Sequence, residues 1–191
     1  MTSGHRIECV VLAALLSLAC LPAAAQWDAA ALLASLARSG PERIAYSETR
    51  RLAYLDAPLT SRGELEFRPP DWLRRSVQGS GDSYVISDDQ LHITSGGGDR
   101  IVMLDVHPGL RAFAESLRAT LAGDLARLQR FFLLELHGDE SSWRLLLRPR
   151  DSEVAALIQS IELSGAQARL QRIETREAGG DVTVTELQAA P

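Results

Sequence analysis

The arrangement of apolar and polar residues changes its period twice along the chain. Across residues 43–106, and again from about 131 to 187, apolar and polar positions mostly alternate. That alternation is typical of β-strands with one buried face. Residues 108–132 and the short segment 29–40 instead carry apolar residues at three- and four-residue spacing, which is typical of amphipathic helices. The pattern predicts a helix, six strands, one or two helices and about five further strands.

The clearest of these strands is the segment 59–68. Leu65 and Phe67 fall on one face, and Glu64 and Glu66 fall on the other. Pro69-Pro70 follows at once, and two residues without an N–H cannot continue a central ladder. The double proline therefore predicts a corner, with the next strand beginning at Trp72.

So many antiparallel strands cannot form a flat open sheet. We predict an α+β fold in which a strongly curved antiparallel sheet of about 11 strands forms a half-barrel. The mid-chain helices at 108–123 and 124–132 are expected to form a lid over its open side, beside the N-terminal helix. A single helical turn is expected after residue 151, before the strand that ends near 165.

The first 25 residues have the pattern of a secretory signal peptide. An apolar run from Val10 to Leu21 is followed by small residues, and cleavage is expected between Ala25 and Gln26. Two alternatives stay open: an uncleaved anchor, and a lipoprotein signal that ends at Cys20. Residues 26–191 are then expected to be exported and to form one domain.

Cysteine and charge restrict the function further. Cys9 and Cys20 both lie in the predicted signal peptide, so the exported chain has no cysteine for a disulfide. The formal net charge is −5, and all 20 basic residues are arginine. An acidic chain with dispersed arginines argues against a nucleic-acid partner. We expect a monomer.

No catalytic or metal-binding pattern is recognisable. His92, His107 and His137 share no ligand spacing, and neither HExxH nor GxSxG occurs. His137 lies near Asp139 and Glu140, as in an acid–base pair, but this segment reads as a hairpin turn. The sequence therefore predicts no cofactor, no metal and no enzyme. A hydrolase that uses His137 is the rival prediction.

The apolar positions of sheet and helices allow two interpretations. They either pack together as a closed core, or they leave a cavity with polar groups at its rim. Periodicity alone does not decide between them. The candidate cavity residues are Leu65, Phe67, Leu73, Met103, Leu110, Phe113, Leu117, Leu121, Trp143, Leu145 and Leu147.

Several segments, in the same order, resemble the periplasmic outer-membrane lipoprotein carrier LolA and its related proteins. These segments are "IAYSETRRLAYLDAPL", "SRGELEFRPPDWLRR", "LRATLAGDLARLQRFF", "LHGDESSWRLLLRPRD", "IQSIELSG" and "REAGGDVTVTEL". The resemblance implies a half-barrel with a helical lid over a cavity for acyl chains. It also implies a shuttle that carries a lipid, glycolipid or lipoprotein between an inner-membrane donor and an outer-membrane acceptor. The same fold implies a second function, a periplasmic sensor or regulatory interaction module.

The resemblance also implies a latch between sheet and lid. In LolA an arginine directly before the strand-end proline holds the lid, whereas this chain has Pro69 at that position. Arg68, Arg74 and Arg75 are the candidate replacements, because arginine carries five donors on a long side chain.

Overall fold

The computed structural model describes residues 27–39 and 43–188. The predicted signal peptide, its cleavage site and Cys20 lie outside these residues. Among the described residues, no helix has the length and apolar character needed to cross a membrane.

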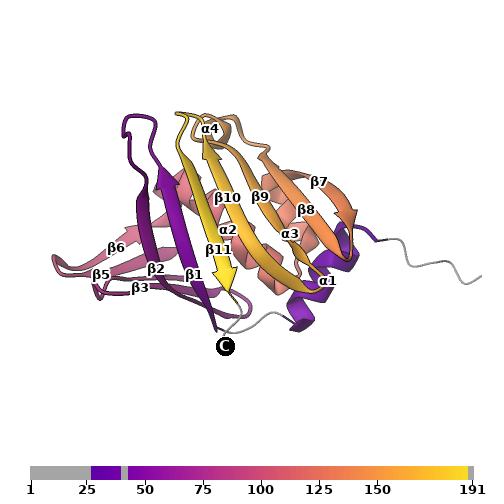
Figure 1. Cartoon of the computed structure of the whole chain (residues 1–191), viewed down its shortest axis with the longest axis horizontal. Helices are drawn as coiled ribbons and strands as arrows, with labels where there is room; N and C mark the ends of the chain where they lie inside the picture. The colour runs from indigo at the N-terminus through magenta and orange to yellow at the C-terminus, as the bar shows by residue number, and fades with distance from the viewer. Residues whose placement is uncertain (1–26, 40–42, 189–191) are drawn as a thin grey trace, which may run out of the picture.

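Eleven strands form one antiparallel sheet (Figure 1). The strand order is β6-β5-β4-β3-β2-β1-β11-β10-β9-β8-β7. The first and last strands therefore lie side by side in the middle of the sheet. The strands span β1 Arg43–Arg51, β2 Leu59–Arg68, β3 Trp72–Val77, β4 Ser83–Ser87, β5 Gln90–Ser95, β6 Gly98–Met103, β7 Phe132–Asp139, β8 Ser142–Pro149, β9 Ile158–Ala166, β10 Arg169–Glu177 and β11 Val182–Gln188. The predicted fold class is confirmed.

The helices lie on one side of the curled sheet, behind β8–β11 in Figure 1. They are α1 (Ala29–Ser39), the 3-10 turn η1 (Leu104–Val106), α2 (Pro108–Ala122), α3 (Leu125–Phe131) and the single turn α4 (Ser152–Ala155). We call residues 104–131 together with α1 the lid.

Local signals set the ends of these helices. Asp28 accepts a hydrogen bond from the amide of Ala31, and Asp124 accepts one from the amide of Arg127. Both contacts satisfy amides of the first helical turn, as an N-cap does. Gly123 ends α2 at φ 73°, a left-handed conformation that favours glycine. The peptide between Pro69 and Pro70, at the corner between β2 and β3, is cis.

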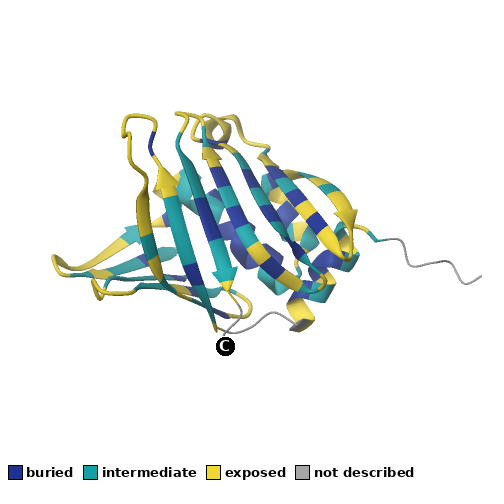
Figure 2. Cartoon of the chain, viewed as in Figure 1, coloured by how far each residue is buried: buried dark blue, intermediate teal, exposed yellow. Residues whose placement is uncertain are grey.

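The core lies between the lid and the inner face of β7–β10. Buried and exposed residues alternate along β8 and β10, as Figure 2 shows. Trp143, Leu145 and Leu147 of β8 point inward and are at most 1% exposed. Leu32, Leu33 and Leu36 of α1 pack into the same core. Burial of this apolar face is the main force that holds the lid on the sheet.

Candidate functional site

An apolar groove of about 480 Å³ lies where α2 begins, between the inner face of β5 and β6 and the residue directly before β9. The groove is within the volume range of small-molecule sites. Its lining residues are Leu91, Ile93, Arg100, Val102, His107, Pro108, Gly109, Leu110 and Leu157.

Strand alternation builds one wall of this groove. In the register of β5 and β6, Leu91 pairs with Val102 and Ile93 pairs with Arg100. All four side chains therefore share one face of the hairpin. Leu157, on the opposite wall, is 48% exposed and lies at the mouth of the groove.

The polar lining residues of the groove include Arg100 and His107, and both are exposed. No carboxylate lines the groove within the described chain. The groove therefore combines apolar lining residues with one exposed arginine. That combination suits an apolar chain with a polar end.

Most of the predicted cavity residues pack into the closed core instead. Phe67, Leu73, Leu117 and the three inward residues of β8 are at most 8% exposed. Phe113 and Leu121 are partly buried and pack against the same core. Leu65 is also partly buried, on the inner face of β2. Of the predicted set, only Leu110 lines the groove that the described residues form.

Met103, one of the predicted cavity residues, does not line this groove. Val102 points inward, and successive strand residues point to opposite faces, so Met103 is directed outward. Its side chain is 42% exposed.

Sequence analysis did not identify Leu91, Ile93, Val102 and Leu157 as groove residues. A signal for the first three was present, because alternation places them on one face of the hairpin. Nothing in their local pattern showed that α2 begins beside them.

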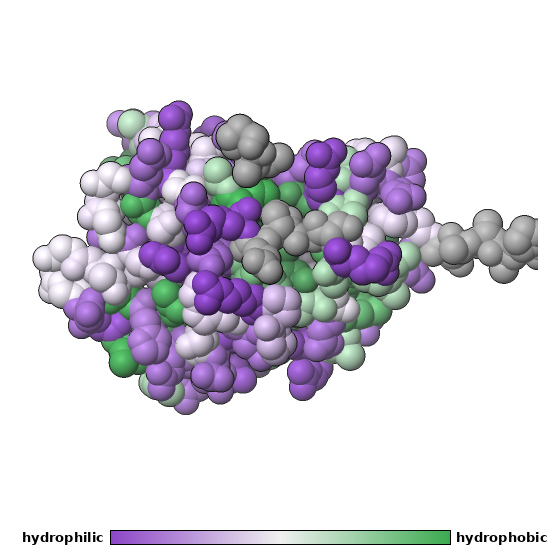
Figure 3. Space-filling model, turned by 90° about the horizontal axis from the view of Figure 1, so that it is seen from below, coloured by the Kyte–Doolittle hydropathy of each residue, from purple (hydrophilic) through white to green (hydrophobic). Residues whose placement is uncertain are grey.

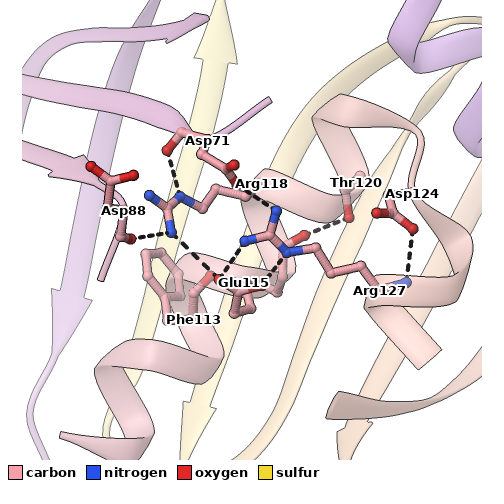
Figure 4. Close-up of polar contacts among 9 residues, drawn as sticks. Asp71, Asp88, Phe113, Glu115, Arg118, Thr120, Asp124 and Arg127 are labelled. Carbon is pink, nitrogen blue, oxygen red and sulfur yellow. Dashed lines mark hydrogen bonds and ion pairs between the residues drawn. The ribbon is translucent and has the colours of Figure 1, made fainter. Parts of the chain in front are cut away.

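The lid is joined to the sheet by a cluster of charged residues, shown in Figure 4. Arg118 of α2 is 1% exposed. It donates from Nε to the carbonyl oxygen of Asp71 at 2.6 Å, and from Nη1 to that of Asp88 at 2.8 Å. These two carbonyls belong to the turns that join β2 to β3 and β4 to β5. One side chain thus connects the lid helix with two hairpin ends.

A second arginine strengthens this contact. Arg127 of α3 donates to both carboxylate oxygens of Glu115, with 2.9 Å between Nη2 and Oε1. It also forms an ion pair with the carboxylate of Asp71. Hydrogen bonds to Glu115 and Asp71 raise the pKa of Arg127 above its ordinary value. Because Glu115 also contacts Arg118 at 3.4 Å, the cluster links α2, α3 and the β2–β3 turn.

The three latch candidates contact residues of the sheet. Arg68 donates to Glu66 at 2.6 Å and stacks on the ring of Trp72, 4.4 Å from its centroid. Arg74 donates to the hydroxyl of Ser83. The contacts that join lid and sheet come instead from Arg118 and Arg127.

Arg75 occupies a different place, on the inner face of β3. It donates to Glu48 at 2.8 Å and to Ser61 at 3.1 Å, and it lies over the rings of Tyr46 and Tyr84. Burial raises the pKa of the Tyr46 hydroxyl, and the nearby Arg75 opposes that shift. The inner face is thus apolar beneath the helices and polar at β1–β3.

The histidines do not form a cluster among the described residues. His137 lies 3.8 Å from the carboxylate of Glu135, and both side chains are about half exposed. Asp139 instead accepts hydrogen bonds from the hydroxyl and amide of Ser141, which lower its pKa. Over residues 27–39 and 43–188, no three potential metal ligands come together.

The solved structures that match this chain share little sequence identity with it. A LolA superfamily protein from Nitrosomonas europaea, NE2245, is 12% identical, with a TM-score of 0.47 over 84% of this chain and 91% of that chain. MucB in its complex with MucA, from Pseudomonas aeruginosa, is 17% identical, with a TM-score of 0.44 over 86% of this chain and 58% of that chain. The lipoprotein LppX of Mycobacterium tuberculosis is 12% identical, with a TM-score of 0.41 over 83% and 93% of the two chains.

Comparison with the sequences of curated proteins gives no match. A family model described as "Outer membrane lipoprotein carrier protein LolA-like" matches residues 21–191. That match extends from before the described domain to the last residue of the chain. The protein therefore belongs to the LolA-like family of outer membrane lipoprotein carrier proteins.

Proposed function

We propose that this protein is a non-enzymatic periplasmic carrier that binds acyl chains and moves them toward the outer membrane. The observation that carries the proposal is the apolar groove between the β5–β6 hairpin and the start of α2. Each buried methylene contributes about 0.8 kcal/mol. A chain with ten buried methylenes would gain about 8 kcal/mol before ordering costs, in the range of micromolar binding.

The proposal also covers the export of the protein and its working cycle. A signal peptide over residues 1–25 is removed after Ala25, and residues 26–191 work as one monomeric domain. Cargo is received from an inner-membrane donor and released to an outer-membrane acceptor. The lid opens and closes during this cycle.

The experiment compares two adjacent residues of β6. Val102→Glu places a charge in the groove, whereas Ile101→Glu places it on the outer face, where Ile101 is 57% exposed. We expect Val102→Glu to abolish the binding of a fluorescent fatty acid and Ile101→Glu to retain it. Native mass spectrometry of the gently purified wild type should find a bound lipid. If the wild type carries no lipid and takes up no fatty acid, the carrier function is wrong.

One observation favours a second function, a periplasmic regulatory module that binds a protein. The tip between β1 and β2 exposes apolar side chains: Tyr54 is 77% exposed, Leu55 44% and Leu59 51%. Such a patch is typical of a contact surface. A pull-down that returns one stoichiometric protein and no lipid, and that fails with Tyr54→Ser, would favour this second function.

A further inference from the structure

We propose that the groove selects a fatty acid, with its single acyl chain on the apolar floor and its carboxylate at Arg100. This inference rests on the proposed function, because it assumes that an acyl chain occupies the groove. It adds the chemical class of the cargo and names Arg100 as the residue that determines specificity.

The position of Arg100 supports this role. Its partner in the β5–β6 ladder is Ile93, which lines the groove, so Arg100 lies directly beside an apolar wall. Its guanidinium has neither an ion pair nor a hydrogen bond with any described residue. Asp99, the adjacent residue, is directed to the opposite face of the strand. A guanidinium free of protein partners can bind both oxygens of a carboxylate.

The surroundings of Arg100 favour an anion over a cation. The other polar lining side chain is His107, which offers a ring N–H. Pro108 and Gly109 also line the groove, so the positive end of the dipole of α2 lies there. The whole chain is acidic, with a formal net charge of −5, whereas the described lining of this groove has an arginine and no carboxylate.

The size of the groove favours one acyl chain. A water molecule occupies about 30 Å³ in the liquid, and a methylene group is of similar size. The volume of about 480 Å³ is therefore enough for one acyl chain of roughly 16 such groups.

The first test uses three probes with the same twelve-carbon chain: dodecanoate, dodecanol and dodecyltrimethylammonium. Their affinities are measured near neutral pH, at low and at high salt. We expect dodecanoate to bind several-fold more tightly than dodecanol, and the cation to bind most weakly. High salt should reduce the preference for dodecanoate, because the rim is exposed and salt screens its charge.

The second test changes the charge of Arg100. Arg100→Gln should weaken the binding of dodecanoate by roughly threefold to fivefold, as expected for an exposed ion pair. It should leave the binding of dodecanol unchanged. Arg100→Glu should reverse the order and make the cation bind more tightly than dodecanoate. The matched control is Arg144→Gln, which removes the same charge from the outer face of β8.

The outcomes separate this inference from the proposed function. Equal binding of dodecanoate and dodecanol by the wild type would overturn the role of Arg100 and leave the carrier function intact. Binding of none of the three probes would overturn both. Tighter binding of a lysophosphatidylglycerol with the same chain than of dodecanoate would overturn the assignment to a carboxylate.

Discussion

Arg118 carries a charge in an almost completely buried position, with only 1% of its side chain exposed. A buried charge is tolerated when it is paired and hydrogen-bonded. Arg118 meets that condition through two main-chain carbonyls and the carboxylate of Glu115. Asp71 and Asp88 lie across the interface from α2, so these two hydrogen bonds exist only while the lid is closed.

Arg118→Met tests this contact. Methionine has a similar length, but it leaves the carbonyls of Asp71 and Asp88 without their donor. We expect the free energy of unfolding to fall by about 2–4 kcal/mol, measured by urea denaturation. Arg130→Met, at an exposed position of α3, is the control and should change stability by less than about 0.5 kcal/mol. Equal effects of the two substitutions would contradict the assigned role of Arg118.

Glu66 gives a pH-dependent contribution to stability. A hydrogen bond from Arg68 lowers the pKa of Glu66 in the folded protein, and Arg43 adds a nearby charge. A carboxyl whose pKa is lowered by folding stabilises the protein above its unfolded pKa, about 4.3. The stabilisation is lost as the pH falls through the lower, folded pKa.

The prediction concerns the difference in melting temperature between the wild type and Glu66→Gln. This difference should be largest near neutral pH, shrink below about pH 4.3 and disappear at more acidic pH. Glu64→Gln is the matched control on the same strand, because Glu64 is 57% exposed and lies 3.9 Å from Arg43. It should show little difference at any pH. A difference for Glu66→Gln that stays constant with pH would refute the assignment.

For single residues, the sequence predicts those roles that depend on neighbours in the chain. The helix boundaries predicted near residues 29, 123 and 124 agree with the caps at Asp28, Gly123 and Asp124, whose hydrogen-bond partners are only a few residues away. Arg118 was not, since its acceptor at Asp71 is 47 residues away and is a main-chain carbonyl. Every residue has the same main-chain carbonyl, so no sequence pattern marks this acceptor.

Strand β2 illustrates how elements constrain single positions. It lies between β1 and β3, and Gly63 faces Tyr46 on one side and Val77 on the other. A Cβ atom on Gly63 would lie 1.8 Å from the main-chain oxygen of Ser76 and 3.0 Å from the ring of Tyr46. The strands therefore pack too closely at this point for any side chain.

Gly63→Ala should lower the free energy of unfolding by about 1–3 kcal/mol or more, because the clash is with backbone that cannot rotate away. The measurement is again urea denaturation. Gly97→Ala is the control in the turn between β5 and β6, where the nearest atom is the Ser95 hydroxyl at 3.8 Å. It should change stability by less than about 0.5 kcal/mol. A tolerated Gly63→Ala would mean that β2 and β3 can separate at little cost.

The elements themselves were predicted well, because hydrophobic period distinguishes strand from helix along the whole chain. Which inner faces stay uncovered was not predictable in this way. Phe67 and Leu73 alternate with polar residues just as Leu91 and Ile93 do. Phe67, Leu73 and Leu91 are buried in the core, whereas Ile93 is only partly buried and lines the groove together with Leu91. That difference depends on where α2 begins in space.

The order of the strands makes most of the lid a single insertion between β6 and β7. Residues 104–131 leave the sheet after Met103 and return at Phe132, at opposite edges of the sheet. The strands β1 and β11, which join the two halves, lie outside this insertion. The lid can therefore move without breaking any strand pairing.

The surface and the polar contacts are consistent with such a movement. Seen from below Figure 1, patches of hydrophobic surface lie among hydrophilic residues (Figure 3). Among the described residues, three buried side-chain nitrogens have no hydrogen-bond partner: those of Trp27, Arg111 and Arg118. Arg111 and Arg118 belong to α2, and Trp27 precedes α1. An unpaired buried donor costs about 1–3 kcal/mol, so these three nitrogens lower the stability of the closed lid.

This arrangement predicts that the lid opens before the sheet unfolds. In native-state hydrogen exchange of the wild type, amides of α2 and α3 should exchange with an opening free energy at least about 2 kcal/mol below that of β8–β10. A fatty acid that binds the closed form should raise the value for the lid, by about 2.7 kcal/mol at a hundredfold excess over Kd. Val102→Glu, which fills the groove with a charge, should remove that increase. If helices and strands exchange with one common free energy, lid and sheet open as a single unit, and a carrier cycle based on lid movement is excluded.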